Sequence, residues 1–116
     1  MRVEWLTAAE DDLREIARRV ALTFGRDTAE RAVASVVEET QRLSDFPELG
    51  RRCNEYKNAR RQYRAINTRH DRIVYTITTD CILIVAIFDT QRDPKALGDL
   101  LSDRDDLEIG DKDNNG

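Results

Sequence analysis

Two amphipathic stretches dominate the first half of the chain. Apolar residues recur every three or four positions from Thr7, the first residue of a Thr-x-x-Glu capping pattern, and the stretch ends at Gly25. A second stretch begins at Asp27, which we expect to cap its first turn, and keeps this spacing as far as Phe46. The spacing predicts two helices. Because only two or three residues join them, we expect an antiparallel hairpin.

The pattern changes to that of strands after the second predicted helix. Polar, irregular residues from Arg51 to Asn58 indicate a loop. Apolar, aromatic and β-branched residues then favour strands, and the four predicted strands are Val3–Leu6, Gln62–Ile66, Arg72–Thr78 and Cys81–Phe88. The last is apolar almost throughout, which is typical of a central strand covered on both faces. Asp93 and Pro94 predict the start of a short helix ending near Leu101.

This order of elements predicts an α+β fold. The N-terminal strand and the antiparallel helical hairpin are expected to pack on a small, largely antiparallel β-sheet. The length of 116 residues fits a single domain with one modest core. We place this domain at residues 1–101 and expect residues 102–116 to form an acidic, disordered tail.

Basic and acidic residues are segregated along the chain, although the net charge is only −4. The segment 99–116 holds seven acidic residues and two basic ones, whereas the segment 51–72 holds eight basic residues and two acidic ones. Seven of those eight are arginine, whose planar guanidinium suits phosphate. We therefore expect a basic working surface. One hypothesis is that the acidic tail screens it, and the alternative is a solvated tail.

Several classes of protein are excluded by the remaining composition. The longest apolar run, Ile82–Phe88, has seven residues and is too short to cross a membrane, and the first residues lack the apolar core of a secretory signal. Cys53 and Cys81 form no CxxC pair, and His70 is the single histidine. We expect a reduced, cytoplasmic protein that uses no metal and no other cofactor.

Four stretches, taken in this order and at these distances, resemble the RelE/ParE superfamily of bacterial toxins. The resemblance runs from Val3 to about Leu97, and the stretches that carry it are Val3–Trp5 with Ala8–Ile16, Leu43–Arg51, Tyr63–Arg64 with Arg72–Tyr75, and Ile87–Pro94. The fold that it implies is the α+β arrangement predicted above. It also implies the toxin of a type II toxin–antitoxin module of the plasmid-stabilisation kind, neutralised by a cognate antitoxin in a hetero-oligomeric complex.

The resemblance leaves three activities open. ParE-like members inhibit DNA gyrase by binding, and this is the function that we favour. RelE-like members cleave mRNA on the ribosome without a metal, so an arginine cluster in this chain could make it an endoribonuclease. A third reading is an inactive member that serves only as a binding partner. Whether the chain is an enzyme therefore stays open, and we favour a binding function.

Arginines are the candidate site residues under each of these readings. For binding a target or a phosphate group, the candidates are Arg51, Arg61, Arg64, Arg72 and Arg92. For a nuclease, the resemblance places Arg72 at a catalytic position, and the further candidates are Arg64, Arg92 and His70. Some nuclease members also carry a His-Tyr pair after the last strand, where this chain has Asp89, Thr90 and Gln91. This difference weakens the nuclease reading. An ion pair with Asp89 or Asp93 is the structural alternative for Arg92.

Overall fold

Five strands form one mixed sheet in the computed structural model, which describes residues 1–107. The strand order is β1-β5-β4-β3-β2, in which β1 pairs in parallel with β5 and the other neighbours are antiparallel. In chain order the elements are β1 (Arg2–Trp5), α1 (Thr7–Phe24), α2 (Arg26–Asp45), β2 (Arg51–Cys53), β3 (Tyr63–Asn67), β4 (Asp71–Ile77), β5 (Cys81–Asp89) and α3 (Pro94–Arg104). The α+β class expected from the sequence is confirmed.

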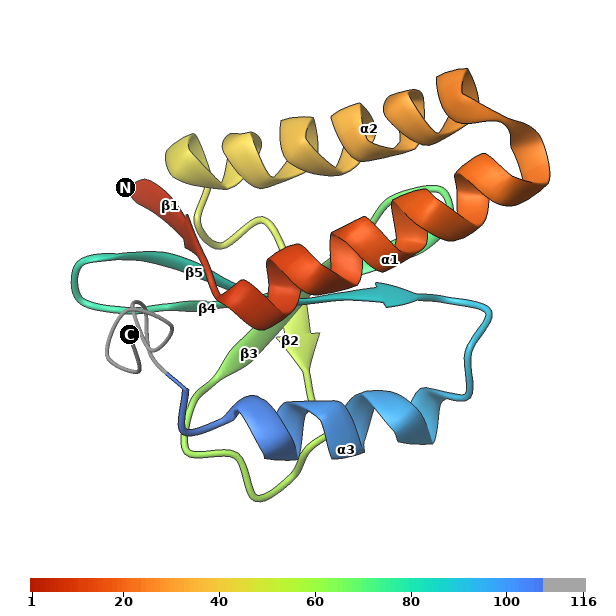
Figure 1. Cartoon of the computed structure of the whole chain (residues 1–116). Coiled ribbons are helices and arrows are strands. Elements are labelled where there is room, and N and C mark those ends of the chain that lie inside the picture. Colours follow the sequence, from red (N-terminus) through yellow and green to blue (C-terminus); the bar gives the residue numbers. More distant parts are fainter. Residues whose placement is uncertain (108–116) are drawn as a thin grey trace, which may run out of the picture.

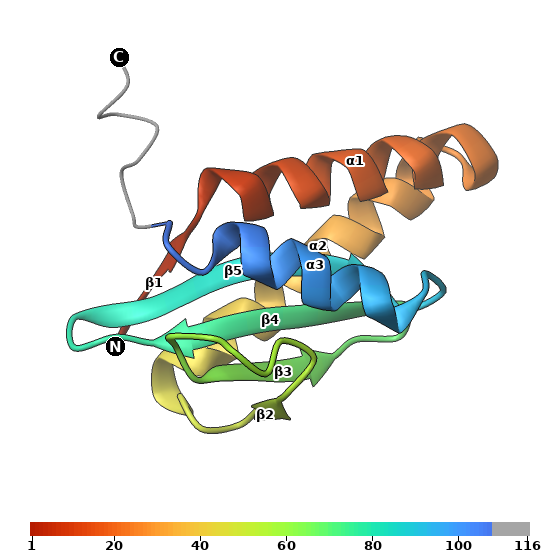
Figure 2. The same cartoon turned by 90° about the horizontal axis from the view of Figure 1, so that it is seen from below.

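Helices cover both faces of the sheet (Figure 1). The α1–α2 hairpin packs on one face, and α3 lies across the other, as the view from below also shows (Figure 2). Every residue from Cys81 to Phe88 is consequently buried. The apolar run thus correctly predicted a strand covered on both faces. The middle position in the strand order, however, belongs to β4.

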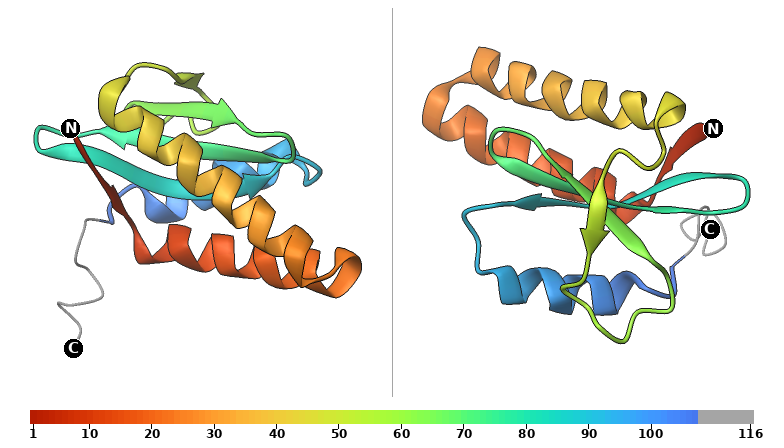
Figure 3. Two further views of the ribbon diagram at one scale, coloured as in Figure 1. Left: turned by 90° about the horizontal axis from the view of Figure 1, so that it is seen from above. Right: turned by 180° about the vertical axis from the view of Figure 1, so that it is seen from behind.

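The hairpin connection is tighter than the sequence pattern predicts. Gly25 alone separates the two helices, and its φ of 96° lies in a region that L side chains rarely adopt. As a result α2 begins at Arg26, and Gly25 occupies the capping position expected for Asp27. Likewise Leu6 precedes α1, and no side chain caps that helix. The two helices meet at this turn and diverge away from it (Figure 3).

Two elements extend beyond their predicted limits. Residues 51–53, expected in a loop, form β2 because Arg51 and Cys53 pair with Ala65 and Tyr63 at the edge of the sheet. Helix α3 continues to Arg104 instead of ending near residue 101, and Asp105 is buried. The predicted start of the disordered tail at residue 102 is therefore wrong, because residues 102–107 belong to the fold. Residues 108–116 of that tail lie outside the described part of the chain.

A partly buried ion pair attaches α3 to the first helix and to β5. Arg104 donates two hydrogen bonds to the Asp12 carboxylate, at 2.6 and 2.9 Å, and a third to the Val85 carbonyl. Asp12 also accepts the main-chain N–H of Ile87. Strand β1 pairs only with residues 81–84 of β5. Beyond the residues that pair with β1, the edge of β5 therefore has its main-chain hydrogen-bonding groups at Val85 and Ile87 occupied by the side chains of Arg104 and Asp12.

Candidate functional site

The register of β3 and β4 decides where the candidate arginines lie. Arg64 stands opposite Tyr75, and Arg72 stands opposite Asn67. Side chains alternate between the two faces along a strand, and Arg72 is three positions from Tyr75. Arg64 therefore points to the hairpin side of the sheet, and Arg72 points to the α3 side. The two arginines occupy neighbouring strands, as expected, but they do not form one cationic site.

Arg72 and Arg92 are both neighbours of Phe88, and Arg92 lies over its ring. Arg72 is paired in register with Phe88 of β5, and the Arg92 guanidinium lies over the Phe88 ring, 5.0 Å from its centroid. Arg72 also donates to the Glu55 carboxylate at 2.6 Å and to the Asn67 side-chain oxygen at 3.2 Å. Its charge is therefore already balanced by a carboxylate within the protein.

The Glu55 carboxylate connects Arg72 to a buried cysteine. The Cys53 thiol donates to Glu55 at 2.8 Å, and burial, followed by the neighbouring carboxylate, raises the pKa of Cys53 to about 12. Burial opposes ionisation of Glu55, but the hydrogen bonds from Cys53 and Arg72 outweigh it and hold its pKa below the usual value. Cys53 is thus an inert thiol, and Glu55 is an ionised partner of Arg72.

His70 lies in the exposed turn between β3 and β4. Its carbonyl oxygen accepts the main-chain N–H and the hydroxyl of Thr90, at 3.1 and 2.9 Å. These bonds bring the His70 turn beside the turn that follows β5, which carries Arg92. The structure thus places Arg72, Arg92 and the His70 turn at one end of the sheet. Asp89, one of the two carboxylates considered as the alternative ion-pair partner of Arg92, pairs with Arg19 of α1.

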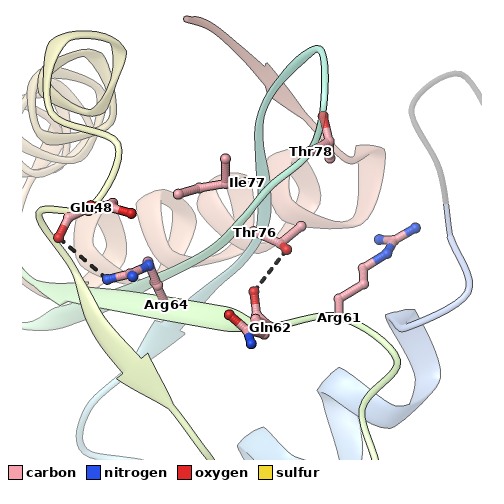
Figure 4. A pocket seen from close by; sticks show the side chains of 7 residues that line it. All are labelled: Glu48, Arg61, Gln62, Arg64, Thr76, Ile77 and Thr78. Carbon is pink, nitrogen blue, oxygen red and sulfur yellow. Dashed lines mark hydrogen bonds between the residues drawn. The ribbon is translucent and has the colours of Figure 1, made fainter.

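Arg61 and Arg64 line a separate polar pocket of about 540 Å³ (Figure 4). The pocket opens where β3 begins beside β4, and its other lining residues are Glu48, Gln62, Thr76, Ile77 and Thr78. Arg64 donates to the carbonyl oxygen of Gly50 at 2.8 Å and to that of Glu48 at 3.4 Å. Arg61 donates to the carbonyl oxygen of Leu107. Arg51, the fifth arginine candidate, is exposed on edge strand β2.

The loop between α2 and β2 is held rigidly against this pocket. The Tyr75 hydroxyl donates to the Pro47 carbonyl at 2.7 Å and accepts the N–H of Gly50 at 2.8 Å. A Cβ atom at Gly50 would lie 2.8 Å from the Tyr75 ring and 2.9 Å from the Ala65 carbonyl, so only glycine fits. Arg64 also holds this loop, through its hydrogen bonds to the Gly50 and Glu48 carbonyl oxygens, which gives this arginine a structural role.

The end of α3 is held by residues of the basic segment. Asp105 accepts the Tyr63 hydroxyl at 2.6 Å and the main-chain N–H of Arg60 at 2.7 Å, while Asp106 pairs with the Arg60 side chain. Burial opposes ionisation of Asp105, but these hydrogen bonds outweigh it and hold the pKa of Asp105 below its usual value. Part of the basic segment thus binds residues 105–107, while any contact of residues 108–116 lies outside the described residues.

A shallow apolar groove of about 630 Å³ runs between the two hairpin helices. Small and apolar side chains line it, namely Ala17, Ala21, Ala29, Ala34, Val33 and Val37. The rim residues Arg14 and Arg18 are already paired with acidic residues on the same helix, at 2.8 and 2.6 Å. The groove therefore offers apolar contact with little free charge.

Neither a metal centre nor a membrane span is found within residues 1–107. No group of three or more His, Cys, Asp or Glu side chains in this range is arranged to hold a metal ion. In the same range no helix combines the length and hydropathy that crossing a membrane requires.

Comparison with known proteins shows which family has this sequence and fold. The family model described as the ParE toxin of the type II toxin–antitoxin system parDE matches residues 3–94. The chain belongs to the ParE toxin family. It is the toxin of a type II toxin–antitoxin system, and its partner is a cognate antitoxin. No curated protein sequence matches the chain.

A solved structure has the same fold as this ParE-family chain. It is described as the chromosomal ParDE toxin–antitoxin system from P. aeruginosa, and it matches with a TM-score of 0.65 at 20% sequence identity. The match covers 77% of this chain and 95% of the other. At this identity the likeness concerns the fold. The resemblance inferred from the sequence is therefore confirmed at the level of family and fold.

Sequence reasoning missed three structural contacts of this ParE-family chain. These are the Asp12–Arg104 pair, the Tyr63–Asp105 hydrogen bond and the Tyr75 contacts to the loop at Gly50. Their partners are 92, 42 and 25 positions apart, respectively. The spacing of residues within one segment gives no information about partners that lie so far apart in the sequence.

Proposed function

We propose that this ParE-family toxin inhibits DNA gyrase by binding to it and that a cognate antitoxin prevents this by occupying the toxin. The observation that supports binding over catalysis is the separation of the arginines. Arg64 braces a loop on one face, and Arg72 is paired with Glu55 on the other. A cleavage site for RNA needs cations and proton-transfer groups converging on one phosphate. An inhibitor that works by contact needs only a complementary surface.

A helical segment of the antitoxin is the occupant that we propose for the groove between α1 and α2. The alanines of its floor let another helix approach closely, and the paired arginines of its rim do not require acidic partners. An amphipathic helix with an apolar stripe fits this chemistry. The partner supplied for the test is the small protein encoded beside the toxin gene.

The first experiment is induced expression in a bacterial host, with DNA and protein synthesis followed by pulse labelling over the first minutes. We expect growth arrest in which DNA synthesis falls before protein synthesis, and rescue by the co-expressed antitoxin. Purified toxin is then expected to inhibit supercoiling by gyrase. An earlier fall in protein synthesis would contradict the gyrase proposal.

Ribosome-dependent cleavage of mRNA is the second candidate function. It is favoured by the group of residues at the other end of the sheet, where Arg72 is paired in register with Phe88, Arg92 lies over the Phe88 ring, and the His70 turn is adjacent. Under this alternative, Arg72→Ala and Arg92→Ala would each abolish cleavage while the protein stays folded. Under the gyrase proposal, neither substitution removes more than a small part of the toxicity. The inactive-member reading requires that expression leaves growth unchanged.

A further inference from the structure

Three of the six exposed large apolar side chains of the described residues lie together. Phe46, Leu49 and Ile77 are 60%, 42% and 36% exposed and line a shallow pocket of about 560 Å³ with Pro47 and Glu48. Glu48 and Ile77 also line the arginine pocket. The two pockets therefore form one continuous surface, which we call the edge surface. Apolar residues gathered in this way mark interaction sites more often than scattered ones do.

The positive charge of Arg64 is available on the edge surface, whereas Arg61 lies close enough to the Asp105 carboxylate to interact with it electrostatically. Arg64 and Arg61 both donate to main-chain carbonyl oxygens, which are neutral acceptors. One terminal nitrogen of Arg61 is buried without a hydrogen-bond partner within residues 1–107, so Arg61 does not present this nitrogen to an incoming group. Arg72, in contrast, forms an ion pair with Glu55 at 2.6 Å. An incoming carboxylate is therefore better matched to the edge surface than to the Arg72 end.

A main-chain edge is open at the same place. Pairing of β4 with β3 ends at Thr76, opposite Tyr63, but β4 itself continues to Ile77. Beyond Thr76, whose hydroxyl donates to the Gln62 carbonyl at 2.9 Å, no strand within the described residues pairs with β4 on this side. The β4–β5 hairpin visibly projects past β3 (Figure 2). An extended segment could therefore add to β4 beside the apolar and basic groups.

The surface is also preorganised. The loop that carries Phe46 and Leu49 is tied to the sheet by the Tyr75 hydroxyl and by Arg64, as described above. Binding to a rigid surface costs less conformational entropy than binding to a mobile one. The hairpin groove shares no lining residue with the edge surface. Two partners could therefore use the two surfaces independently.

We infer that the edge surface is the site that engages the toxin's protein target, and that it binds an extended acidic segment carrying one large apolar side chain. In this arrangement the apolar side chain rests between Phe46, Leu49 and Ile77, and a carboxylate reaches Arg64, while Arg61 adds positive charge on the other side of the pocket (Figure 4). Single-stranded RNA fits less well, because it favours several stacking rings along an unbroken basic groove. Here Phe46 is the one exposed ring among aliphatic neighbours, and Glu48 interrupts the basic groups. The inference rests on the proposed function.

The test uses two substitutions on the edge surface and two matched controls. Phe46→Glu and Leu49→Glu remove apolar contact and add a charge that repels carboxylates. Phe24→Glu and Leu22→Glu make the same changes at side chains that are 70% and 75% exposed at the hairpin tip, outside both pockets and the groove. All four positions are exposed, so the melting temperature of the purified proteins should stay close to that of the wild type.

Growth arrest, gyrase inhibition and antitoxin affinity are then measured for each variant. We expect Phe46→Glu and Leu49→Glu to raise the toxin concentration needed for half-inhibition of gyrase at least about tenfold. Their growth arrest should weaken accordingly, with affinity for the antitoxin within about twofold of the wild type. Both control variants should behave as the wild type. Raising the salt concentration should weaken gyrase inhibition by the wild type, because an acidic segment binds the arginines electrostatically.

Other outcomes overturn the inference. Unchanged toxicity of the two edge variants would show that the target binds elsewhere. Loss of antitoxin affinity with unchanged toxicity would assign the edge surface to the antitoxin. If the wild type formed a dimer that Phe46→Glu dissociates, the occupant would be a second copy. If a chain ending at residue 107 inhibited gyrase more strongly, and Phe46→Glu no longer weakened it, residues 108–116 would be the occupant.

The proposed function can fail separately from this inference. If the wild type arrests growth without inhibiting gyrase, the gyrase proposal is overturned, and the same variants compared by growth arrest still decide whether the edge surface engages the target. If that arrest follows mRNA cleavage, retained cleavage by the edge variants overturns the inference. If the wild type does not arrest growth at all, both are overturned.

Discussion

Each face of the sheet carries a buried tyrosine whose hydroxyl holds a distant segment in place, but the two segments differ in chemistry. On the hairpin side, Tyr75 bonds to main-chain groups of Pro47 and Gly50, which are neutral. On the α3 side, Tyr63 bonds to the carboxylate of Asp105, and that segment is further attached by the Asp12–Arg104 pair. Both groups that the Tyr75 hydroxyl contacts in the loop are therefore neutral, although the Arg64 guanidinium also donates to this loop, whereas Tyr63 holds the end of α3 through a carboxylate.

This difference matters for function because the loop carries exposed side chains that can be substituted without loss of stability, whereas the charged groups at the end of α3 cannot. The loop held by Tyr75 carries the exposed residues Phe46 and Leu49, which can be changed without touching its attachments. The end of α3 has its charged groups engaged within the protein. We therefore expect the target to bind on the hairpin side, and we expect the contacts on the α3 side to contribute mainly to stability.

The largest effect is expected for the ion pair that attaches α3. Arg104→Ala leaves the Asp12 carboxylate with one hydrogen bond, although both side chains are only 14–16% exposed. Removing one partner of a buried pair costs about 3 kcal/mol of unfolding free energy. Urea denaturation of the purified protein measures this loss. A cost as small as that of an exposed pair, for example in Arg14→Ala, would contradict the anchoring role of α3.

The two tyrosine hydroxyls provide a direct comparison of the faces. Tyr63→Phe removes a hydrogen bond to a buried carboxylate and should cost about 2 kcal/mol, while Tyr75→Phe removes bonds to neutral groups and should cost about 1 kcal/mol. Urea denaturation of both variants gives the two values. Equal costs would mean that the charge of Asp105 contributes nothing to the attachment.

The pH dependence of stability should also distinguish the Tyr63 and Tyr75 hydrogen bonds. The pKa of Asp105 is lowered in the folded protein, so its ionised form stabilises the fold above the pKa of the unfolded chain, about 3.9, and this contribution is lost as the pH falls further. The cost of Tyr63→Phe should therefore shrink between pH 7 and pH 3. The cost of Tyr75→Phe should stay constant, because its partners do not titrate. Thermal melting across this range separates the two.

The smallest effect is expected at the pair of carboxylates where β4 meets β5. Asp71 is buried opposite Asp89, and burial, followed by the charge of Asp89, raises the pKa of Asp71. A raised pKa means that ionised Asp71 destabilises the fold, increasingly as the pH rises through that pKa. Asp71→Asn should therefore raise stability at pH 7 by less than about 1 kcal/mol, with a smaller gain at acidic pH. A loss of stability at pH 7 would show that the ionised form is needed.

Local patterns predicted most of the elements, for reasons that lie within each segment. The three- and four-residue spacing up to Gly25 and up to Phe46 requires helices, and the apolar run from Cys81 requires a strand buried on both faces. The stretches Leu43–Arg51 and Tyr63–Arg64 with Arg72–Tyr75 also indicated the family, which is confirmed. Errors occurred at Asp27, Arg51 and residue 102, where helix ends or sheet pairing depend on neighbours outside the segment.

The candidate site could be predicted as a list of arginines but not as a surface. The amino-acid sequence by itself determined which residues are basic, which stretches are helical or extended, and therefore the fold class. Only the tertiary structure decided that Arg64 and Arg72 face opposite ways, because the register between β3 and β4 sets the face of each side chain. The tertiary structure also placed Phe46 beside Ile77 and brought the Asp105 carboxylate within hydrogen-bond distance of the Tyr63 hydroxyl. Such contacts join residues tens of positions apart, and they form only when the packing of the whole sheet brings them together.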